Sequence, residues 1–301
     1  RIKSVANINK ITKAMELVAA TKMRKSQEIA LASRPYAFAA FNMLANLSLL
    51  EKDMPMLLKK RKINKTLFVL FASDKGLAGA FNSSLFRKFD SSLAEVKEGQ
   101  EKLFLAIGEK SSGHLSKKNL PVVGKFTQVG DYTTTEEVKP ICNFLIEGYL
   151  NKQWDKVVVY YSHFKSALKQ EPMIREILPV NFDLVKKTVM EIIPETGKFA
   201  ELIREHNINF IPEKSQKNYL IEPSPKKVLE SLISHLIFMQ VYHLILEANA
   251  SEHSARRVAM KTASDNASDI SGELNLQYNK SRQAAITKEI IEITAGAEAL
   301  N

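Results

Sequence analysis

The stretch from Pro225 to about Ala295 constrains the fold more than any other part of the chain. It contains no proline after Pro225, and its only glycine before Gly296 is Gly272. Ser224 is a favourable N-cap for a helix with proline at its first position, and Gly296 is a suitable stop. One helix of about 70 residues would be about 105 Å long. Such a helix must pack against something equally long or project into a partner.

The size of the side chains changes along this stretch. Its first part carries large apolar residues at helical spacing: Leu229, Leu232, Ile233, Leu236, Ile237 and Val241. Small residues such as Ala250, Ser254, Ala259, Ala263 and Ala267 dominate the part after Ala248. Small side chains let a second helix approach closely, so the pattern predicts a slim two-helix rod. The alternative is a long surface helix of a helical domain.

The first 58 residues contain no glycine and form the natural partner. Val5, Ile8, Thr12, Met15 and Ala19 step by three and four, which predicts a helix whose apolar face Ile2, Ile11, Val18 and Met23 would widen. Pro35 predicts a kink near residues 33–34 within an arm of about 85 Å. We expect the two arms to form an antiparallel coiled coil from which the longer C-terminal helix protrudes.

Between the arms, strand and helix signals alternate. The sequence predicts strands over 66–72, 102–107, 121–123, 157–163 and 174–180, and helices over 82–96, 109–118 and 134–150. Residues 186–216 are mixed, and 219–221 predict a last extended piece. The alternation predicts a largely parallel sheet. The fold class is therefore α/β plus coiled coil, with a coiled-coil arm over 1–58, an inserted α/β domain over 62–222 and a second arm over 223–301.

Composition narrows the choice of partner without deciding it. Lys and Arg outnumber Asp and Glu by 43 to 33, which suits nucleic acid, an anionic membrane or an acidic protein. The start of the first arm is one-signed: within the first 25 residues Glu16 is the only acidic residue, against seven basic ones, Arg1, Lys3, Lys10, Lys13, Lys22, Arg24 and Lys25. A single cysteine, Cys142, predicts a reducing compartment. No apolar run approaches the length expected of a membrane span.

No motif predicts catalysis. The turn SDKGLAG (Ser73–Gly79) follows a buried strand but lacks the GxGxxG and GxxxxGK[ST] patterns of phosphate loops, so its glycines are interpreted as serving a tight turn. The six histidines have no metal-ligand spacing, and no nucleophile–base set stands out. Asp265, Asp269 and Glu273 form an acidic line on the second arm, either solvated or facing a cationic partner. We expect no catalytic residue, cofactor or metal ion.

Several motifs at both ends and in the centre closely resemble the gamma subunit of F-type ATP synthase. They are KITKAMELVAATKMRK (10–25), SRPY (33–36), SDKGLAGAFN (73–82), EPSP (222–225), ASEHSARRVAMKTASDNA (250–267) and LNLQYNKSRQAAITKEIIEI (274–293). Ala78 and Ala80 stand where the family often has cysteine and glycine. The resemblance spans essentially the whole chain.

The resemblance implies a rotor shaft with a Rossmann-like domain. Its partners would be the alpha3beta3 hexamer, the epsilon subunit and the c-ring of Fo, at the cytoplasmic side of the bacterial inner membrane. Catalysis would belong to beta. Met15 and Arg256 match positions near the acidic lever loop of beta, with Lys10, Lys13, Lys22, Arg24 and Lys25 as a cationic surround. Arg282, Gln283 and Thr287 match catch-loop contacts, and Ile290, Ile291, Ile293 and Leu300 match the bearing tip.

Two other hypotheses stay open at this stage. A basic coiled-coil arm on an α/β domain could bind nucleic acid, which would show as an affinity that falls steeply with salt. Interleaved surface aromatic residues, typical of single-strand platforms, are lacking, and the acidic line opposes this hypothesis. A small-molecule enzyme built on the α/β domain would bind nucleotide by itself.

Overall fold

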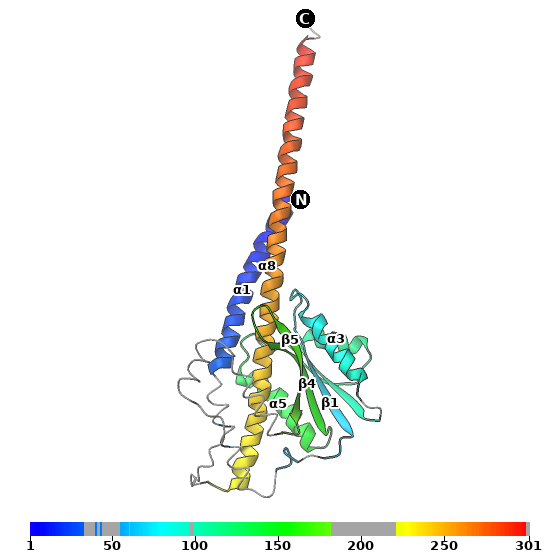
Figure 1. Ribbon diagram of the computed structural model, residues 1–301, viewed down its shortest axis with the longest axis vertical. Coiled ribbons are helices and arrows are strands. Elements are labelled where there is room, and N and C mark those ends of the chain that lie inside the picture. The colour runs from blue at the N-terminus through cyan, green and yellow to red at the C-terminus, as the bar shows by residue number, and fades with distance from the viewer. Residues whose placement is uncertain are drawn as a thin grey trace.

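The computed structural model describes residues 1–32, 40, 43, 55–59, 61–96, 99–181 and 221–298. Two long helices, α1 (Ile2–Ala32) and α8 (Pro225–Glu298), lie side by side and run antiparallel (Figure 1). The 74-residue α8 continues well past the N-terminus of α1 and projects alone. The single long C-terminal helix predicted from the sequence is therefore confirmed.

A five-stranded sheet lies beside the lower half of α8 (Figure 1). Its strand order is β3-β2-β1-β4-β5, formed by β1 (Lys65–Phe71), β2 (Glu101–Ile107), β3 (Val122–Phe126), β4 (Lys156–Phe164) and β5 (Gln170–Leu178). The first four strands are parallel, and β5 pairs antiparallel with β4. The result is a mixed α/β sheet, close to the predicted parallel one but with an antiparallel edge strand.

Alternate side chains of the central strands point to opposite faces of the sheet, as the period of two requires. Leu67, Val69 and Phe71 of β1 join the apolar cluster shared with α5 (Thr135–Leu150) and α8. Phe68 and Leu70 join the cluster under the helices α3 (Phe81–Ala94) and α4 (Glu109–Lys117). The central strands β1 and β4 are buried on both faces, which explains their continuous apolar runs.

Local signals placed the helices of the domain correctly. Thr134 caps α5 in a capping box: its side chain accepts from the Glu137 amide, and the Glu137 carboxylate accepts from the Thr134 amide. The third strand is longer than the predicted 121–123, and the fifth begins at Gln170 rather than 174.

The buried face of α1 differs from the predicted one. Thr12, Glu16, Ala19, Met23 and Ser26 are buried, and the three-and-four spacing is kept. The predicted members Ile8, Ile11 and Val18 are instead half exposed, at 50%, 59% and 55%. The apolar pattern was therefore wrong for these three residues, because α8 offers a seam of small side chains that accepts small and polar neighbours. The Pro35 kink and the predictions for 186–216 and most of 219–221 lie outside the described residues.

Candidate functional site

A polar cluster lies where α1, α8 and the carboxyl end of the sheet meet. Parallel strands bring the loops that follow them to one edge, the usual ligand edge of an α/β domain. Here the loop after β1, residues 72–80, and the loop after β3, residues 127–134, both face the two long helices. The long helices therefore occupy the edge where an α/β enzyme would bind its substrate.

Asp131, in the loop after β3, connects both long helices. Its Oδ2 accepts from the ammonium of Lys22 on α1, and its Oδ1 accepts from Nε2 of His253 on α8 at 2.9 Å. The Ser26 hydroxyl donates to the backbone carbonyl of Asp131 at 3.2 Å. One carboxylate thus ties two helices to one loop of the domain.

The same network continues from His253 to the loop after β1. Nη1 of Arg256 lies 3.2 Å from Nδ1 of His253, and its Nη2 donates to Oε1 of Glu252 at 2.5 Å and to the Gly76 carbonyl at 3.2 Å. Because a guanidinium only donates, Nδ1 of His253 must accept and Nε2 must carry the proton. The histidine is therefore a neutral relay between Arg256 and Asp131.

The protonation states of this network follow from its surroundings. Burial lowers the pKa of His253 to about 4, against the attraction of Asp131. Burial alone would raise the pKa of Asp131, but the hydrogen bond from Lys22 and the nearby positive charges lower it. Burial raises the pKa of Glu252, although Arg256 opposes the rise. At neutral pH the network holds a neutral imidazole between a carboxylate and a guanidinium.

Asp74, in the loop after β1, binds the backbone that follows β2 and β3. Its two carboxylate oxygens accept from the backbone amides of Glu109, at 2.9 Å, and Gln128, at 3.0 Å. Leu77 and Gly79 in the loop after β1 have φ angles of 61° and 57°, a conformation that favours glycine. The SDKGLAG turn is therefore a fixed structural turn, in line with its interpretation from the sequence.

A cavity of about 650 Å³ lies between the helices and these loops. Its walls include Met15 and Val18 of α1, Leu77 of the loop after β1, and Glu252 and Arg256 of α8. Leu77 and Val18 are exposed, at 64% and 55%. The groove therefore combines apolar side chains with charged groups that already have partners.

The predicted site residues separate into two groups. Met15, Lys22 and Arg256 come together at the junction, and Arg256 is only 9% exposed. Lys10, Lys13, Arg24 and Lys25 are exposed on α1; Lys13 pairs with Glu16 at 2.9 Å and Lys25 approaches Glu28 at 4.0 Å. Such exposed pairs contribute about 0–1 kcal/mol each.

The remaining predicted residues lie on the part of α8 that projects beyond α1. Arg282, Gln283 and Thr287 are exposed there, and so are Ile290, Ile291 and Ile293, at 56%, 59% and 68%. Leu300 lies outside the described residues. A helix with exposed isoleucines over its last turns presents apolar surface that a partner would cover.

Sequence reasoning missed Asp131, His253 and Asn249. Asn249 donates to the Gly130 carbonyl at 3.1 Å and to Thr133 Oγ1 at 2.9 Å. In the sequence, Glu252 and Arg256 have only the i,i+4 spacing of an ordinary helical ion pair. The available signal was a histidine four residues after an asparagine in a stretch of small residues, but the partners of both side chains lie in a distant loop.

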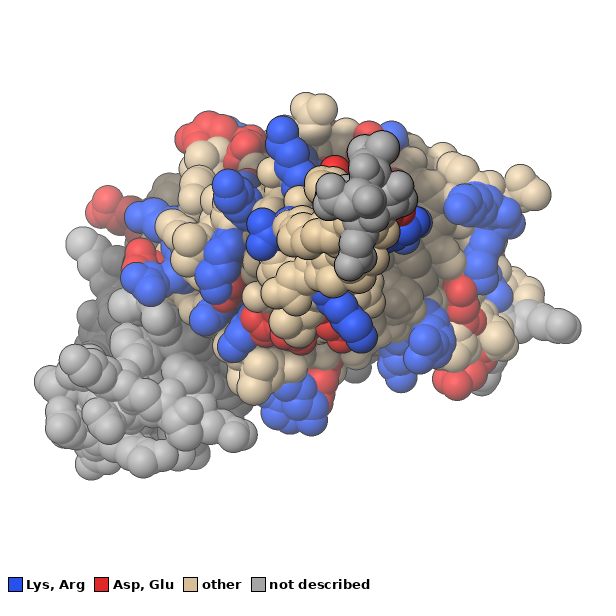
Figure 2. Space-filling model, turned by 90° about the horizontal axis from the view of Figure 1, so that it is seen from above, with Lys and Arg blue, Asp and Glu red and all other residues tan. Residues whose placement is uncertain are grey.

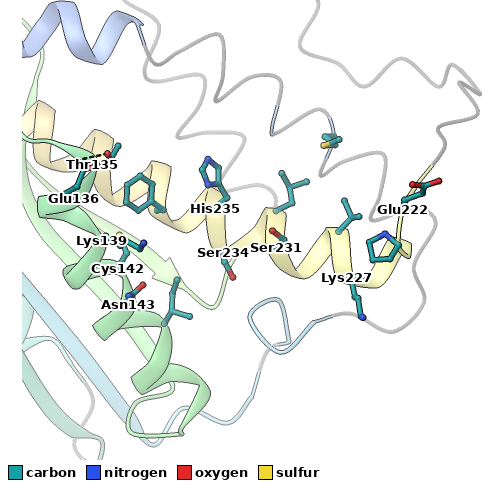
Figure 3. A pocket seen from close by; sticks show the side chains of 16 residues that line it. Thr135, Glu136, Lys139, Cys142, Asn143, Glu222, Lys227, Ser231, Ser234 and His235 are labelled. Atoms are coloured by element: carbon teal, nitrogen blue, oxygen red, sulfur yellow. Dashed lines mark hydrogen bonds between the residues drawn. The ribbon is translucent and has the colours of Figure 1, made fainter.

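A second, more open cavity of about 920 Å³ lies between α5 and the start of α8 (Figure 3). Thr135, Lys139 and Cys142 line it from α5, and Ser231 and His235 from α8. Burial raises the pKa of the Cys142 thiol to about 12, so it is not an activated nucleophile. Over the described parts of the chain, no cluster of three or more His, Cys, Asp or Glu is arranged to hold a metal ion.

Basic side chains do not form a continuous stripe on the face seen from the C-terminal tip. Lys and Arg there are interspersed with Asp and Glu around the rod and over the domain (Figure 2). The junction network also neutralises Lys22 and Arg256 with Asp131 and Glu252. This mixed distribution gives no support to a nucleic-acid groove, which would need one-signed charge.

The apolar part of α8 corrects one expectation from the sequence. Among the described helices, α8 alone is long and apolar enough to span a membrane by length and composition, with a mean hydropathy of 1.4 over its most apolar window. That window is 56% buried inside the protein. Leu229, Ile233 and Leu236 in this region pack in the core beside the sheet, so the apolar run is accounted for by the fold.

The fold and the junction define a class of protein in which a long, asymmetric pair of helices packs along a small α/β domain and contacts its loops. The family model described as ATP synthase matches residues 1–300. The ATP synthase gamma chain of Methylobacillus flagellatus is 37% identical, with 100% of this chain and 97% of that protein covered. That of Opitutus terrae is 39% identical, covering 98% and 95%. The chain therefore belongs to the ATP synthase gamma chain family.

Solved structures agree on the fold. The central stalk and c-ring structure of Tetrahymena thermophila mitochondrial ATP synthase contains a chain with a TM-score of 0.58 and 24% identity, covering 84% of this chain and 99% of that one. A chain in the rotor of Euglena gracilis mitochondrial ATP synthase has a TM-score of 0.59 and 17% identity, covering 95% and 96%. At these identities the likeness concerns the fold alone.

Proposed function

We propose that this chain is the central rotor shaft of an F-type ATP synthase. It transmits torque between the membrane c-ring and the catalytic beta subunits, so that proton or sodium flow is coupled to ATP synthesis or hydrolysis. The observation that carries the proposal is the lone projection of α8 beyond α1 in a chain of the gamma family. A single off-axis helix lacks three-fold symmetry, so it presents a different side to each of three surrounding sites.

The architecture suits this function. The two arms, 1–58 and 223–301, would form the coiled coil, and 62–222 would form a Rossmann-like domain below it. Small buried residues such as Ala19 and Ala267 keep the helix pair slim. Apolar and exchangeable charged contacts on the exposed surface would let the shaft turn without sticking, because exposed ion pairs contribute about 0–1 kcal/mol each.

The partners follow from the same proposal. One copy of the chain would sit in the cavity of an alpha3beta3 hexamer, with the epsilon subunit and the c-ring at the domain end. The complex would be peripheral to the bacterial inner membrane on its cytoplasmic side. The chain would be non-catalytic and would bind no cofactor, with ATP chemistry on beta.

The contact residues divide along the rod. Met15 and the face around Arg256 would meet the acidic lever loop of beta, with Lys10, Lys13, Lys22, Arg24 and Lys25 around them. Because the Arg256 guanidinium is held by Glu252 and Gly76, its role there includes shaping the groove. Arg282, Gln283 and Thr287 would meet the catch loops. Ile290, Ile291, Ile293 and Leu300 would form the bearing tip.

The test is reconstitution. Alpha and beta subunits are assembled with and without this chain, and ATP hydrolysis is followed at saturating ATP. We expect fast, continuous turnover only with the chain present. Equally fast and ordered turnover without it would overturn the proposal.

A further inference from the structure

One short stretch of α8 gathers side-chain hydrogen bonds to several loops of the α/β domain. We define the collar as five residues of this stretch: Glu247, Asn249, His253, Ser254 and Arg256. Below the collar, α8 packs on the sheet through apolar side chains such as Ile233 and Ile237. Above it, α8 contacts α1 and then projects alone. The collar therefore marks the level at which the rod leaves the domain.

The collar contacts the domain on more than one side. Glu247 lies 3.1 Å from the imidazole of His163 on β4. The Ser254 hydroxyl donates to the carbonyl of Ala167, in the turn between β4 and β5, at 2.6 Å and accepts from Nε2 of Gln170, the first residue of β5, at 3.2 Å.

Three further collar residues reach the other loops. Asn249 and His253 reach the loop after β3 through Thr133 and Asp131, and Arg256 reaches the loop after β1 through Gly76. Three loops of one domain thus grip one helix within about three turns.

The hydrogen bonds of the collar fix the rotational angle of α8, which apolar packing alone does not. Burial of apolar surface is non-directional, so a helix held by it alone resists separation better than rotation about its own axis. Hydrogen bonds to charged groups are stronger than those between neutral groups and depend on angle, so they oppose rotation. Through Lys22, Asp131 extends the same grip to α1.

We propose that the collar is the torsional joint of the shaft, with Asp131 and His253 as its positioning residues. The inference rests on the proposed rotor function and adds where torque passes between the rod and the domain. Asp131 acts on no substrate; it holds α1 and α8 at one angle to the sheet through Lys22 and His253. Loss of this joint would let the rod slip against the domain under load.

The experiment uses the complete synthase in membrane vesicles, with ATP-driven ion pumping and ATP hydrolysis measured on the same sample. Asp131→Ala removes the contacts to Lys22 and to His253 at once. Asp131→Asn keeps the shape of the side chain but removes its charge. We expect pumping per ATP hydrolysed to fall by about half or more in Asp131→Ala, with assembly and hydrolysis retained. Glu101→Ala removes an exposed pair with Lys65 at the opposite end of the strands and is the matched control.

A covalent rescue separates slippage from misfolding. A Cβ built on Gly79 would lie 3.7 Å from the Cβ of Ala259, within the range of a disulfide. Gly79→Cys with Ala259→Cys joins the loop after β1 to α8 close to the collar. The cysteine at position 79 lowers stability somewhat, because Gly79 has a φ of 57°, which side chains other than glycine rarely adopt. We expect oxidation to restore coupling to the Asp131→Ala complex and reduction to remove it again.

The outcomes are distinguishable. Normal coupling in Asp131→Ala, or a loss that oxidation of the cysteine pair does not repair, overturns the torsional joint while the rotor function stands. If the unmodified chain fails to drive turnover of the hexamer, the rotor function itself fails. The native Cys142 is buried and does not compete for the engineered thiols.

Discussion

The hydroxyl of Ser264 on α8 donates a hydrogen bond of 2.7 Å to Oδ1 of Asn9 on α1. This contact lies in the seam between the two helices, where Ala267 and Thr12 are also buried. Toward the projecting end of α8, α1 reaches its N-terminus at Ile2 and α8 continues alone. The seam thus ends in small side chains and a polar contact rather than in a large apolar cluster.

A larger side chain in this seam should push the helices apart. Ala267 is 5% exposed, so Ala267→Leu must displace its neighbours and should lower the free energy of unfolding by about 1–3 kcal/mol. Urea denaturation of the isolated chain, followed by circular dichroism, measures the change. Ala285→Leu, on the exposed projection, is the control and should change stability by less than about 0.5 kcal/mol. Equal effects would show that the seam is not closely packed.

Gly148 of α5 packs directly on an indole ring. A Cβ at this position would lie 1.9 Å from Cζ2 of Trp154, whose Nε1 donates to the Leu145 carbonyl at 3.1 Å. Gly148→Ala should therefore lower the free energy of unfolding by about 1–3 kcal/mol, despite the better helix propensity of alanine. Gly113→Ala in α4 meets nothing within 4 Å and should be neutral or stabilising by about 0.5–1 kcal/mol. Denaturation of the two variants in parallel tests the prediction.

The sequence predicts the elements well because their signals are local. The apolar runs of β1 and β4, the capping box at Thr134 and the unbroken stretch of α8 each depend on neighbouring residues. The prediction of which α1 residues are buried was wrong for Ile8, Ile11 and Val18. The partner helix decides which face of α1 is buried, and that partner is far along the chain. Asp131 and His253 escaped notice for the same reason: their role exists only when a loop and a helix meet.

The protonation of His253 should make stability depend on pH. Its pKa is lowered from 6.5 to about 4 in the folded chain, so the unfolded chain binds more protons between these values. Stability should therefore fall as pH decreases from about 6.5 to 4, by about 2–3 kcal/mol from this group. His253→Gln does not titrate and should flatten that part of the curve, measured by urea denaturation at stepped pH. An unchanged slope would place the sensitivity elsewhere.

The projection of α8 allows function to be separated from stability. Arg282 and Gln283 are exposed along this lone helix, so replacing both with alanine should change the free energy of unfolding of the isolated chain by less than about 0.5 kcal/mol. In the assembled hexamer these side chains would face partner loops, and their loss should reduce ATP hydrolysis by about tenfold if they contribute about 1.4 kcal/mol to a rate-limiting step.

The matched control is Asn275→Ala with Lys280→Ala, two exposed polar positions on the same helix. This variant should keep the turnover of the unmodified complex, because neither position belongs to the predicted contact set. Hydrolysis and unfolding are measured on each chain. A loss of turnover confined to the Arg282 and Gln283 variant supports specific contacts. Equal loss in both variants would mean that the helix acts through its general surface, and the residue-level prediction would be wrong.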